Sequence, residues 1–420
     1  MNIREVKSEF LREKYYEIDH SSGLKIYVWP KEGYNTAYGI FGTPFGSIYN
    51  HFTVNGEEVK VPDGIAHYLE HKLFESEEGD AFTLYASTGG NANAFTSFEK
   101  TCYLFSCTNQ FERCLEILLD FVRSPYFTEE TVAKEQGIIA QEIKMYEDSP
   151  EWRVMFNMLE GMYENHPVRL DIAGTVESIA EITPDSLYKC YNTYYNLHNM
   201  ALCVAGKVTP EEVLAICDKV LKPQERAEVV THFPEEPYKV IKSYTEQILP
   251  VAMPMFNLGF KSKGVRSTEE DIAYTDILLF LLASSTSDMY RELMDKGLIN
   301  STFSYEQFEG PGFFSIIFGG ESRDPKACEE IIKKHINMLR ESGIDREAFE
   351  NAQKATYGDA LSSLNSVDTI GNLAVDFHFN NREVFKYFDA IVKAAPEDLE
   401  KRLEKILDTE NTTLSVVKGE

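Results

Sequence analysis

The sequence predicts an α+β fold made of two homologous halves, each a mostly antiparallel sheet packed with helices. Three observations lead to this prediction. In each half, strand-like runs and helical segments occur in groups instead of alternating regularly. A helix followed by a strand occurs twice, at a constant offset of 212 residues. A charged stretch with three prolines lies between the two halves, as expected for a surface linker.

The strand predictions rest on β-branched and aromatic residues between turn formers. The first half opens with two such runs, GLKIYVWP (23–30) and NTAYGIFG (35–42). Amphipathic helical segments follow at 114–125 and 128–148. The second half has strand-like runs at MPMFNLGFKSKG (253–264) and GFFSIIFGG (312–320). Strands and helices grouped in this way favour α+β over a doubly wound sheet.

The internal repeat fixes the predicted domain boundaries. The segment TPDSLYKCYNTYYNLHNMALCVAGK (183–207) aligns with APEDLEKRLEKILDTENTTLSVVKG (395–419), and the alignment pairs Pro184 with Pro396 and Asn199 with Asn411. Each copy closes one half, which predicts domains at 1–220 and 241–420 joined by a linker at 221–240. A chance match is the alternative, because a helix followed by a strand is a common unit.

Composition excludes several classes of protein. The 420 residues are 43% hydrophobic, enough for well-packed cores, and the formal net charge is −27. A chain this acidic repels nucleic acid and anionic lipid, so neither is expected as a partner. The acidity serves solubility or, alternatively, an acidic chamber that favours basic peptides.

The expected location is the cytoplasm. The seven cysteines are odd in number and scattered, without C-x-x-C spacing, which is typical of reduced and mostly buried thiols. The first residues, MNIREVKSEFLREKYYE, alternate in charge where a secretory signal has an apolar run. No stretch reaches the roughly 18 apolar residues of a membrane span, so no membrane association is expected.

The segment HYLEH has the spacing of a metal site. At 100° per residue, His71 lies about 40° and Glu70 about −60° from His67 around a helix, so all three project from one face. Two imidazoles one turn apart can bind a common zinc ion, and the adjacent carboxylate can activate a water at the open position. A pair of ordinary surface histidines is the alternative.

A catalytic zinc site needs a third protein ligand. Glu135 and Glu142 lie two helical turns apart, on a segment flanked by Ile138, Ile139 and Ile143. Two further carboxylates follow, Glu147 and Asp148. Spacing leaves all four open as the third ligand, and ordinary solvated glutamates are the alternative.

These motifs resemble the pitrilysin or insulinase family of inverted-motif zinc peptidases, which includes the mitochondrial processing peptidase. The likeness continues through GGNANAFTSFEKTCYLF, RSPYFTEETVAKEQGIIAQEIKMYEDSPEWR and HPVRLDIAGTVESIAEIT, and it covers most of the first half. It is strongest for short bacterial members. The resemblance implies two homologous α+β halves, in agreement with the repeat, and a Zn²⁺ cofactor.

The resemblance also implies roles for individual residues. His67, His71 and Glu142 correspond to the zinc ligands, and Glu135 to a carboxylate that supports them. Glu70 corresponds to the catalytic residue that activates water for peptide hydrolysis. A further set corresponds to the edge strand that binds an extended peptide by strand addition: Asn93, Ala94, Phe95 and Thr96.

The second half departs from the family pattern. It reads DILLFLLASSTS at the equivalent place, with no histidine. Single-chain-active relatives carry an arginine and a tyrosine seven residues later that contact substrate, whereas here Leu298 follows Arg291 at that spacing and Asn300 stands in the tyrosine's place. Tyr305 would replace that tyrosine only with a shift of register.

This departure predicts a heterodimer with a zinc-less homologous subunit, and a homodimer is the second choice. The function expected is a zinc-dependent endopeptidase that hydrolyses unfolded peptides. The alternative is a non-catalytic core or interaction subunit of the same fold. The presence of Glu70 beside two histidines favours the enzyme, because a structural subunit needs no water-activating carboxylate.

Overall fold

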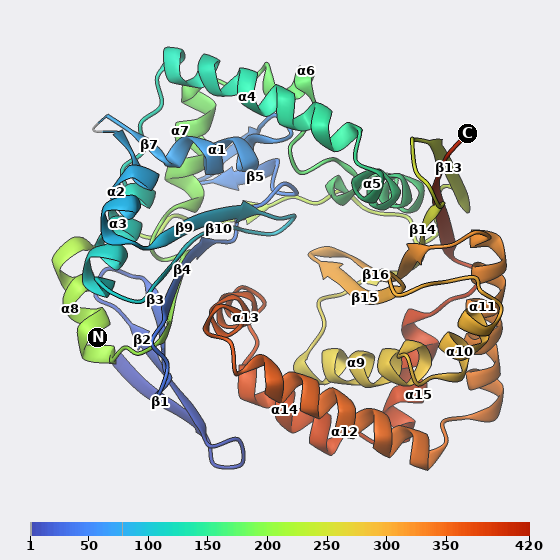
Figure 1. Ribbon diagram of the computed structural model, residues 1–420. Coiled ribbons are helices and arrows are strands. Elements are labelled where there is room, and N and C mark those ends of the chain that lie inside the picture. Colours follow the sequence, from blue (N-terminus) through green and yellow to red (C-terminus); the bar gives the residue numbers. More distant parts are fainter. Residues whose placement is uncertain (1, 78) are drawn as a thin grey trace. The chain divides into compact units, whose positions relative to one another are not determined.

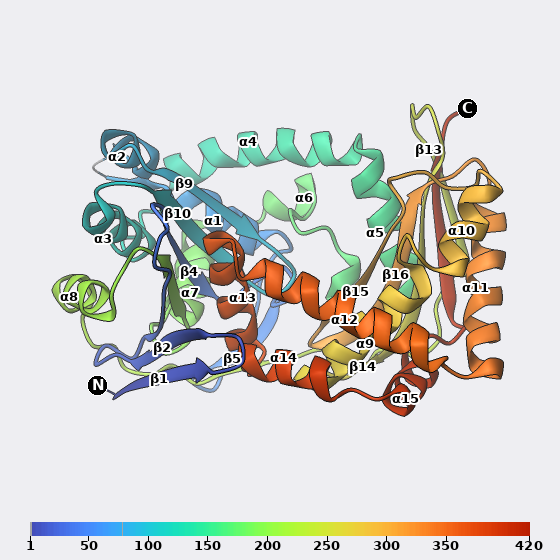
Figure 2. The same ribbon diagram turned by 60° about the horizontal axis from the view of Figure 1, so that its bottom comes forward.

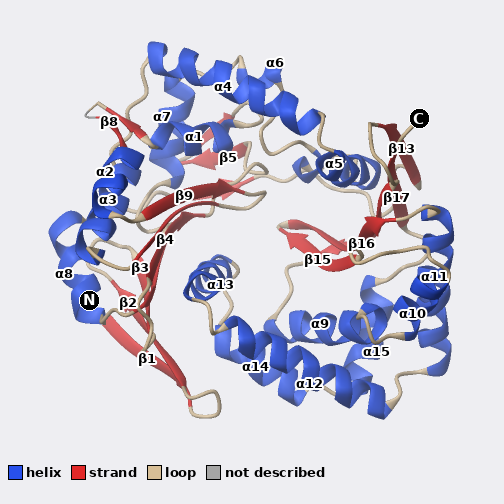
Figure 3. Cartoon of the chain, viewed as in Figure 1, coloured by secondary structure: helices blue, strands red, loops and turns tan. Residues whose placement is uncertain are grey.

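The computed structural model describes residues 2–77 and 79–420 (Figure 1). It contains two compact units, each with one main β-sheet covered by helices. Unit 1 comprises the chain up to Ile143, together with Asp171–His232 and Leu361–Phe385, and unit 2 comprises Lys144–Leu170, Phe233–Ala360 and Lys386–Glu420. Figure 3 distinguishes the helices from the strands, and the mixture confirms the predicted α+β class.

Unit 1 has a seven-stranded sheet in the order β1-β2-β3-β11-β4-β10-β9. Among the described residues of this sheet, only β3 and β11 pair in parallel. Two small sheets, β12-β5-β6 and β7-β8, complete its strands. The bounds are β1 (Asn2–Ser8), β2 (Glu13–Asp19), β3 (Lys25–Pro30), β4 (Ala37–Thr43), β5 (His51–Val54), β6 (Glu57–Lys60), β7 (Glu75–Ser76), β8 (Gly79–Asp80), β9 (Asn91–Thr96), β10 (Thr101–Cys107), β11 (Ala201–Gly206) and β12 (Val229–Thr231).

Helices cover both faces of this sheet at its centre. Strands β4 and β11 are buried along their whole length, as expected when each face has a helical neighbour. The helices of unit 1 are α1 (Ile65–Leu73), α2 (Ala81–Thr88), α3 (Phe111–Val122), α4 (Glu129–Glu147), α6 (Val176–Ile179), α7 (Pro184–Tyr194), α8 (Pro210–Val220) and α13 (Val367–Phe379). Helix α4 runs on to Glu147, four residues past the end of the segment assigned to unit 1.

Helix α13 packs on β4 and β11, whereas α3 contacts β4 and β10 (Figure 2). Gly371 of α13 allows the close approach. A Cβ added to Gly371 would lie 2.6 Å from the ring of Tyr38 and 3.2 Å from Ile40. Any larger residue at position 371 would therefore push α13 away from the sheet.

Unit 2 has a five-stranded sheet in the order β13-β17-β14-β16-β15. Its strands are β13 (Tyr244–Ile248), β14 (Met255–Gly264), β15 (Ser304–Gly310), β16 (Gly312–Glu321) and β17 (Thr412–Lys418). Only β13 and β17 pair in parallel there. Both sheets are therefore mostly antiparallel among the described residues, as predicted.

Most helices of unit 2 share one apolar core with its sheet. The helices of this unit are α5 (Pro150–Met162), the 3₁₀ turn η1 (Pro167–Arg169), α9 (Glu269–Ala283), α10 (Asp288–Asp295), α11 (Pro325–Ser342), α12 (Arg346–Ser363), α14 (Val384–Lys393) and α15 (Pro396–Ile406). Helix α5 contacts β13, β14 and β17, while α11 and α15 contact β14. None of the helices described in either unit has the length and apolar content needed to cross a membrane.

The two sheets share one topology, which supports the internal repeat. The order β3-β11-β4-β10-β9 corresponds to β13-β17-β14-β16-β15, with the parallel pair at the same place. The aligned segments also form equivalent elements, because α7 and α15 begin at Pro184 and Pro396 and lead into β11 and β17. The two halves are thus homologous in structure as well as in sequence pattern.

The compact units take segments from both halves of the sequence. Helix α13 belongs by sequence to the second half, yet it covers the sheet of unit 1. Its counterpart α5 belongs to the first half, yet it covers the sheet of unit 2. The domain boundaries predicted at 220 and 241 separate the two homologous halves of the sequence, and they stay a prediction. The compact units, which are defined by contacts between residues, have different boundaries.

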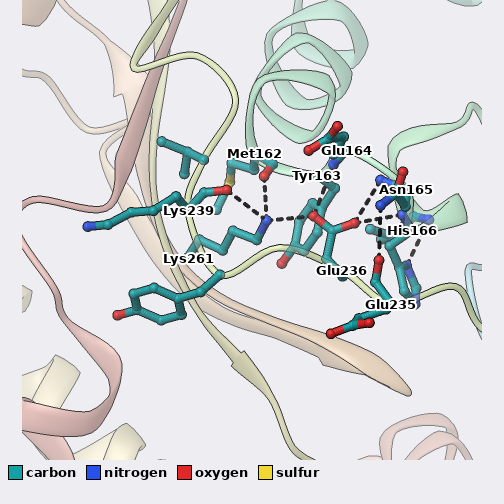
Figure 4. Close-up of polar contacts among 12 residues, drawn as sticks. Met162, Tyr163, Glu164, Asn165, His166, Glu235, Glu236, Lys239 and Lys261 are labelled. Atoms are coloured by element: carbon teal, nitrogen blue, oxygen red, sulfur yellow. Dashed lines mark hydrogen bonds and ion pairs between the residues drawn. The ribbon is translucent and has the colours of Figure 1, made fainter.

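The predicted linker is fixed to both units. Within unit 1, β12 pairs with β5. Within unit 2, the carboxylate of Glu236 accepts hydrogen bonds from the backbone N–H groups of three consecutive residues, Glu164, Asn165 and His166, at 2.9, 2.8 and 2.8 Å (Figure 4). It also forms an ion pair with Lys261 at 2.6 Å, and the two side chains are only 9% and 2% exposed.

Candidate metal centre

Helix α1 carries the HYLEH motif and begins directly after Gly64. Gly64 has a φ of 88°, and a Cβ there would lie 2.3 Å from the carbonyl oxygen of Ala173. Only glycine fits such a position without strain. The helix then presents His67, Glu70 and His71 on one face, with His67 buried and the other two half-buried.

Helix α4 brings two carboxylates to this face. An oxygen of Glu142 lies 3.7 Å from Nε2 of His67, and its other oxygen lies 3.3 Å from Nε2 of His71. Glu135 lies two turns earlier on α4 and contacts the opposite ring nitrogen, Nδ1 of His71, at 3.0 Å. The ring of His71 is therefore held between the two glutamates.

The separations fit a zinc ion. In a tetrahedral site with bonds of about 2.0–2.2 Å, neighbouring ligand atoms lie about 3.3–3.6 Å apart. The distances from Glu142 to the two histidines are close to this range, and one ligand atom from each of the three residues lies within 4.8 Å of the others. Across residues 2–77 and 79–420, no second group of three histidines, cysteines or acidic residues is this close.

Of the four carboxylates that spacing left open, the structure brings Glu142 into the cluster and Glu135 against His71. Glu147 is the last residue of α4 and Asp148 follows the helix; neither belongs to the cluster. A carboxylate that hydrogen-bonds the second nitrogen of a histidine ligand fixes its tautomer and orientation. Glu135 is positioned for this task. The buried Nδ1 of His67 has no such partner among the described residues.

The electrostatics of the cluster favour a cation. Burial lowers the pKa of His67 to about 4, so its imidazole is neutral at physiological pH, which is the form that binds metals. Burial also opposes a charge on His71, but hydrogen bonds to Glu135 and Glu142 outweigh it and raise the pKa of His71 to about 10. Glu142, which faces Nε2 of His71, would hold a divalent cation in place of the proton there.

Glu70 occupies a half-buried position beside the cluster. Burial raises the pKa of Glu70, while a hydrogen bond from Thr96 acts in the opposite direction. Thr96 lies on β9 and donates to Oε2 of Glu70 at 2.7 Å. A raised pKa suits a carboxylate that takes up and releases a proton near neutral pH.

Strand β9 is the edge strand of its sheet and contains the four residues predicted to bind peptide. Asn93 and Ala94 line a cavity of about 640 Å³ together with Glu70 and His71. Phe95 and Thr96 do not line it. Thr96 instead holds Glu70.

Two features of this site were not predicted from the sequence. One is the contact between Thr96 and Glu70, which joins residues 26 positions apart and leaves no local signal. The other is an aromatic wall of the cavity, where the rings of Phe74 and Phe82 stack 4.4 Å apart. Phe74 follows His71 by three residues, so helical spacing could have placed it near the site.

The second-half residues that depart from the family pattern lie in unit 2. Arg291 is exposed on α10 and forms an ion pair with Asp288 at 2.7 Å. The side-chain amide of Asn300 donates to Glu321 at 2.6 Å. Tyr305 is half-buried on β15.

Comparison with known proteins assigns the family. Residues 56–176 match the family described as insulinase (peptidase family M16), and residues 181–356 match the peptidase M16 inactive domain. The uncharacterized zinc protease YmfH of Bacillus subtilis is 40% identical over 426 residues, covering 99% of each chain. The chain belongs to peptidase family M16.

Solved structures agree with this assignment. An M16-like chain from Alicyclobacillus acidocaldarius is 33% identical to this M16 protein, with a TM-score of 0.94 over 99% of this chain and 100% of that one. A chain in complex III2 from Candida albicans is 12% identical, with a TM-score of 0.75 over 96% and 95%, so it shares the fold alone. The predicted pitrilysin or insulinase resemblance is confirmed.

Proposed function

We propose that this M16 protein is a zinc-dependent endopeptidase that hydrolyses unfolded peptides. The observation that carries the proposal is the convergence of His67, His71 and Glu142 beside the half-buried Glu70. Zinc proteases among the relatives, such as YmfH, support it. The inactive-type second domain does not oppose it, because every residue of the candidate centre lies in unit 1.

When bound, zinc would polarise the scissile carbonyl and lower the pKa of a water toward about 7. Glu70 accepts a proton from the attacking water and later donates it to the leaving amine. Thr96 donates to Oε2 of Glu70, so Oε1 keeps more lone-pair capacity for the proton transfer. The hydrogen bond from Thr96 also fixes the rotamer of Glu70. The carboxylate of Glu70 is thereby held in one orientation toward the attacking water.

The edge of β9 receives the peptide. An extended substrate adds to this strand by backbone hydrogen bonds, which requires that the substrate be unfolded. Asn93 and Ala94 border the same cavity as Glu70 and His71, so a peptide on this edge runs past the candidate centre. The aromatic wall of Phe74 and Phe82 gives one part of that cavity an apolar surface.

We also propose that the active species is a heterodimer with a zinc-less homologous subunit, with a homodimer as the second choice. Asn300 stands where active single-chain relatives carry a tyrosine, and its amide is bound to Glu321. The partner would supply the missing arginine and tyrosine. The seven cysteines are unpaired and buried, which is consistent with a reducing compartment such as the cytoplasm.

The test is hydrolysis of a quenched-fluorescent peptide library by the purified chain, alone and with a co-encoded zinc-less relative. Glu70→Gln should lower kcat by about 10²–10⁴-fold while bound zinc stays unchanged. Activity only with the relative supports the heterodimer, and activity of the chain alone refutes it. Bound zinc without cleavage in either form refutes the peptidase and favours the non-catalytic subunit.

A further inference from the structure

The sheet of unit 2 has an open edge at the place where the sheet of unit 1 has a covered one. β3 of unit 1 and β13 of unit 2 are counterparts, because each pairs in parallel with the strand of the internal repeat, β11 or β17. On its other side, β3 is covered by the antiparallel strand β2. β13 is the outermost strand of its sheet, and β17 is its one partner strand among the described residues (Figure 1).

The outer edge of β13 presents backbone groups that are ready to pair. β17 donates a hydrogen bond to the carbonyl of Ser243 at 2.9 Å and accepts one from the N–H of Leu249 at 3.0 Å. Because successive residues of a strand alternate in direction, the odd-numbered residues between these two also face β17. Tyr244, Glu246 and Ile248 therefore point their N–H and C=O groups outward. No hydrogen bond from the described part of the chain reaches these outward groups.

The side chains along this edge are exposed and largely apolar. Thr245 and Gln247 lie on the face of β13 that hydrogen-bonds α5. The opposite face carries Tyr244 and Ile248, which are 38% and 57% exposed. Three further exposed apolar side chains flank the strand in sequence, namely Tyr238, Ile241 and Met253. Exposed apolar groups gathered along one segment are typical of a surface that another molecule covers.

β13 is also poorly protected against pairing. Edge strands that stay unpaired usually carry charges, prolines or bulges. β1, one edge strand of unit 1, has three exposed charged side chains, Arg4, Glu5 and Lys7. β13 has one charged side chain, Glu246, and it forms an ion pair with Lys418 of β17 at 2.9 Å. The edge of β13 is therefore suited to the addition of a strand.

We propose that β13 pairs with β13 of a second copy of this chain, in antiparallel orientation about a twofold axis at Glu246. In this register all three outward residues of each copy find backbone partners, and Tyr244 lies opposite Ile248 of the partner subunit. An aromatic side chain opposite a β-branched one is a favourable cross-strand pair. β2 and β3 of unit 1 use the same kind of pair, with Tyr16 opposite Val28. The covered edge within the chain thus shows what kind of strand the open edge accepts.

The charges in this register support a second copy as the partner. The two copies of Glu246 lie opposite each other, and two carboxylates alone would repel. Each carboxylate has its own Lys418 at 2.9 Å, so the four groups sum to zero charge. The net charge of −27 opposes contact between copies in general, and a locally neutral, apolar edge avoids that repulsion. This association uses residues of unit 2 and needs no zinc, so it is independent of the proposed peptidase activity.

The experiment measures self-association of the purified full chain by sedimentation velocity at several concentrations. The native chain is expected to form a dimer that dissociates on dilution, because a single pair of short strands is a small interface. Ile248→Lys places a charge opposite Tyr244 and is expected to weaken the dimer about tenfold. Val392→Lys is the matched control and should leave the dimer unchanged, because Val392 is similarly exposed, at 53%, but lies on α14 of unit 2.

A second variant removes a backbone donor. The N–H of Ile248 faces away from β17, so Ile248→Pro leaves the pairing within unit 2 intact. The twofold axis makes each substitution act twice, and the dimer loses two backbone hydrogen bonds. We expect Ile248→Pro to weaken the dimer about tenfold or more. If this variant fails to fold, Ile248→Lys decides, because it changes an exposed side chain alone.

A disulfide cross-link tests the register. Residues in a hydrogen-bonded antiparallel pair have Cα atoms about 5.5 Å apart, a separation that a disulfide spans. Position 246 lies on the proposed axis, so oxidised glutathione should convert Glu246→Cys into a covalent dimer. Val392→Cys should stay monomeric on a denaturing gel. The seven native cysteines are buried and should not cross-link.

Several results would overturn the proposal. A native chain that stays monomeric at every concentration does so, and so does a dimer that both Ile248 variants leave unchanged. Equal weakening by Val392→Lys would show that added charge, and not the edge of β13, is responsible. Absence of the cross-link in Glu246→Cys would exclude the twofold register. Loss of peptidase activity would leave all of these results unaffected, because none of the measurements involves hydrolysis.

Discussion

Replacing Glu236 by glutamine tests how strongly the connecting segment is fixed to unit 2. The change keeps the shape of the side chain and removes its charge. It leaves Lys261 as a buried cation that has lost its carboxylate partner. In the native protein the two oxygens of Glu236 receive four donors, two at each oxygen.

The magnitude follows from those contacts. The glutamine oxygen can accept two of the four donors, but its NH₂ group then faces the other two. An unsatisfied buried donor costs about 1–3 kcal/mol, and removing one partner of a buried ion pair costs about 3–5 kcal/mol. We expect unit 2 to lose about 3 kcal/mol of unfolding free energy at neutral pH.

The loss should depend on pH in a defined direction. Burial opposes the charge of Glu236, but Lys261 and the three backbone donors outweigh it, so its pKa in the folded protein is lowered. Its contribution is present above the unfolded pKa of about 4.3 and disappears as pH falls through the folded pKa. The unfolding free energies of the variant and the native protein should therefore become equal at acidic pH.

At alkaline pH the unfolding free energies of the variant and the native protein should again approach each other. Burial lowers the pKa of Lys261, and Glu236 partly offsets this effect. In the variant the offset is lost, so folded Lys261 releases its proton at a lower pH than it does in the native protein. The unfolded state then binds more protons than the folded state over a wider pH range, and the stability of the variant rises more with pH than that of the native protein.

Urea unfolding measures the effect. In a Trp29→Phe background, Trp152 is the remaining tryptophan and reports unit 2. Glu235→Gln serves as the matched control, because Glu235 is the exposed carboxylate next in sequence. A loss below about 1 kcal/mol, or one that is constant between neutral and alkaline pH, would refute the reasoning.

Three further predictions concern the candidate metal centre. Glu142→Gln should abolish zinc retention in equilibrium dialysis, whereas Glu135→Gln should weaken affinity about 10–100-fold; equal effects would contradict their different positions. Thr96→Val removes a donor that lowers the pKa of Glu70, so the acidic limb of kcat/KM should move to higher pH, and Thr96→Ser should restore it; an unmoved limb would exclude this role. Removal of zinc by EDTA should lower the melting temperature reported by Trp29, since a ligand stabilises the state that binds it, and added zinc should reverse the change.

The sequence was most informative where the chemistry is local. The spacing of His67, Glu70 and His71 on one helix follows from 3.6 residues per turn, and the structure has them on one face as expected. The third carboxylate could not be chosen in this way. The choice between Glu142 and Glu147 depends on how α4 lies against α1, which the spacing of residues within either helix does not determine.

The domain organisation shows the same limit. The repeat between 183–207 and 395–419 indicated two homologous halves, and the matching strand orders support it. An amphipathic pattern shows that a helix such as α5 or α13 has an apolar face, but not which sheet that face covers. The contribution of each helix to the unit of the other half therefore became visible only in three dimensions.

The position of α13 has a consequence for synthesis on the ribosome. The sheet of unit 1 is assembled from strands that end at Gly206 or earlier, but the helix that covers β4 and β11 spans Val367–Phe379. One apolar face of those strands therefore stays exposed until most of the chain has been translated. At about 5–20 residues per second, the delay between Gly206 and Phe379 is on the order of ten seconds or more. During that interval the nascent chain needs a chaperone, or another temporary cover, for this face.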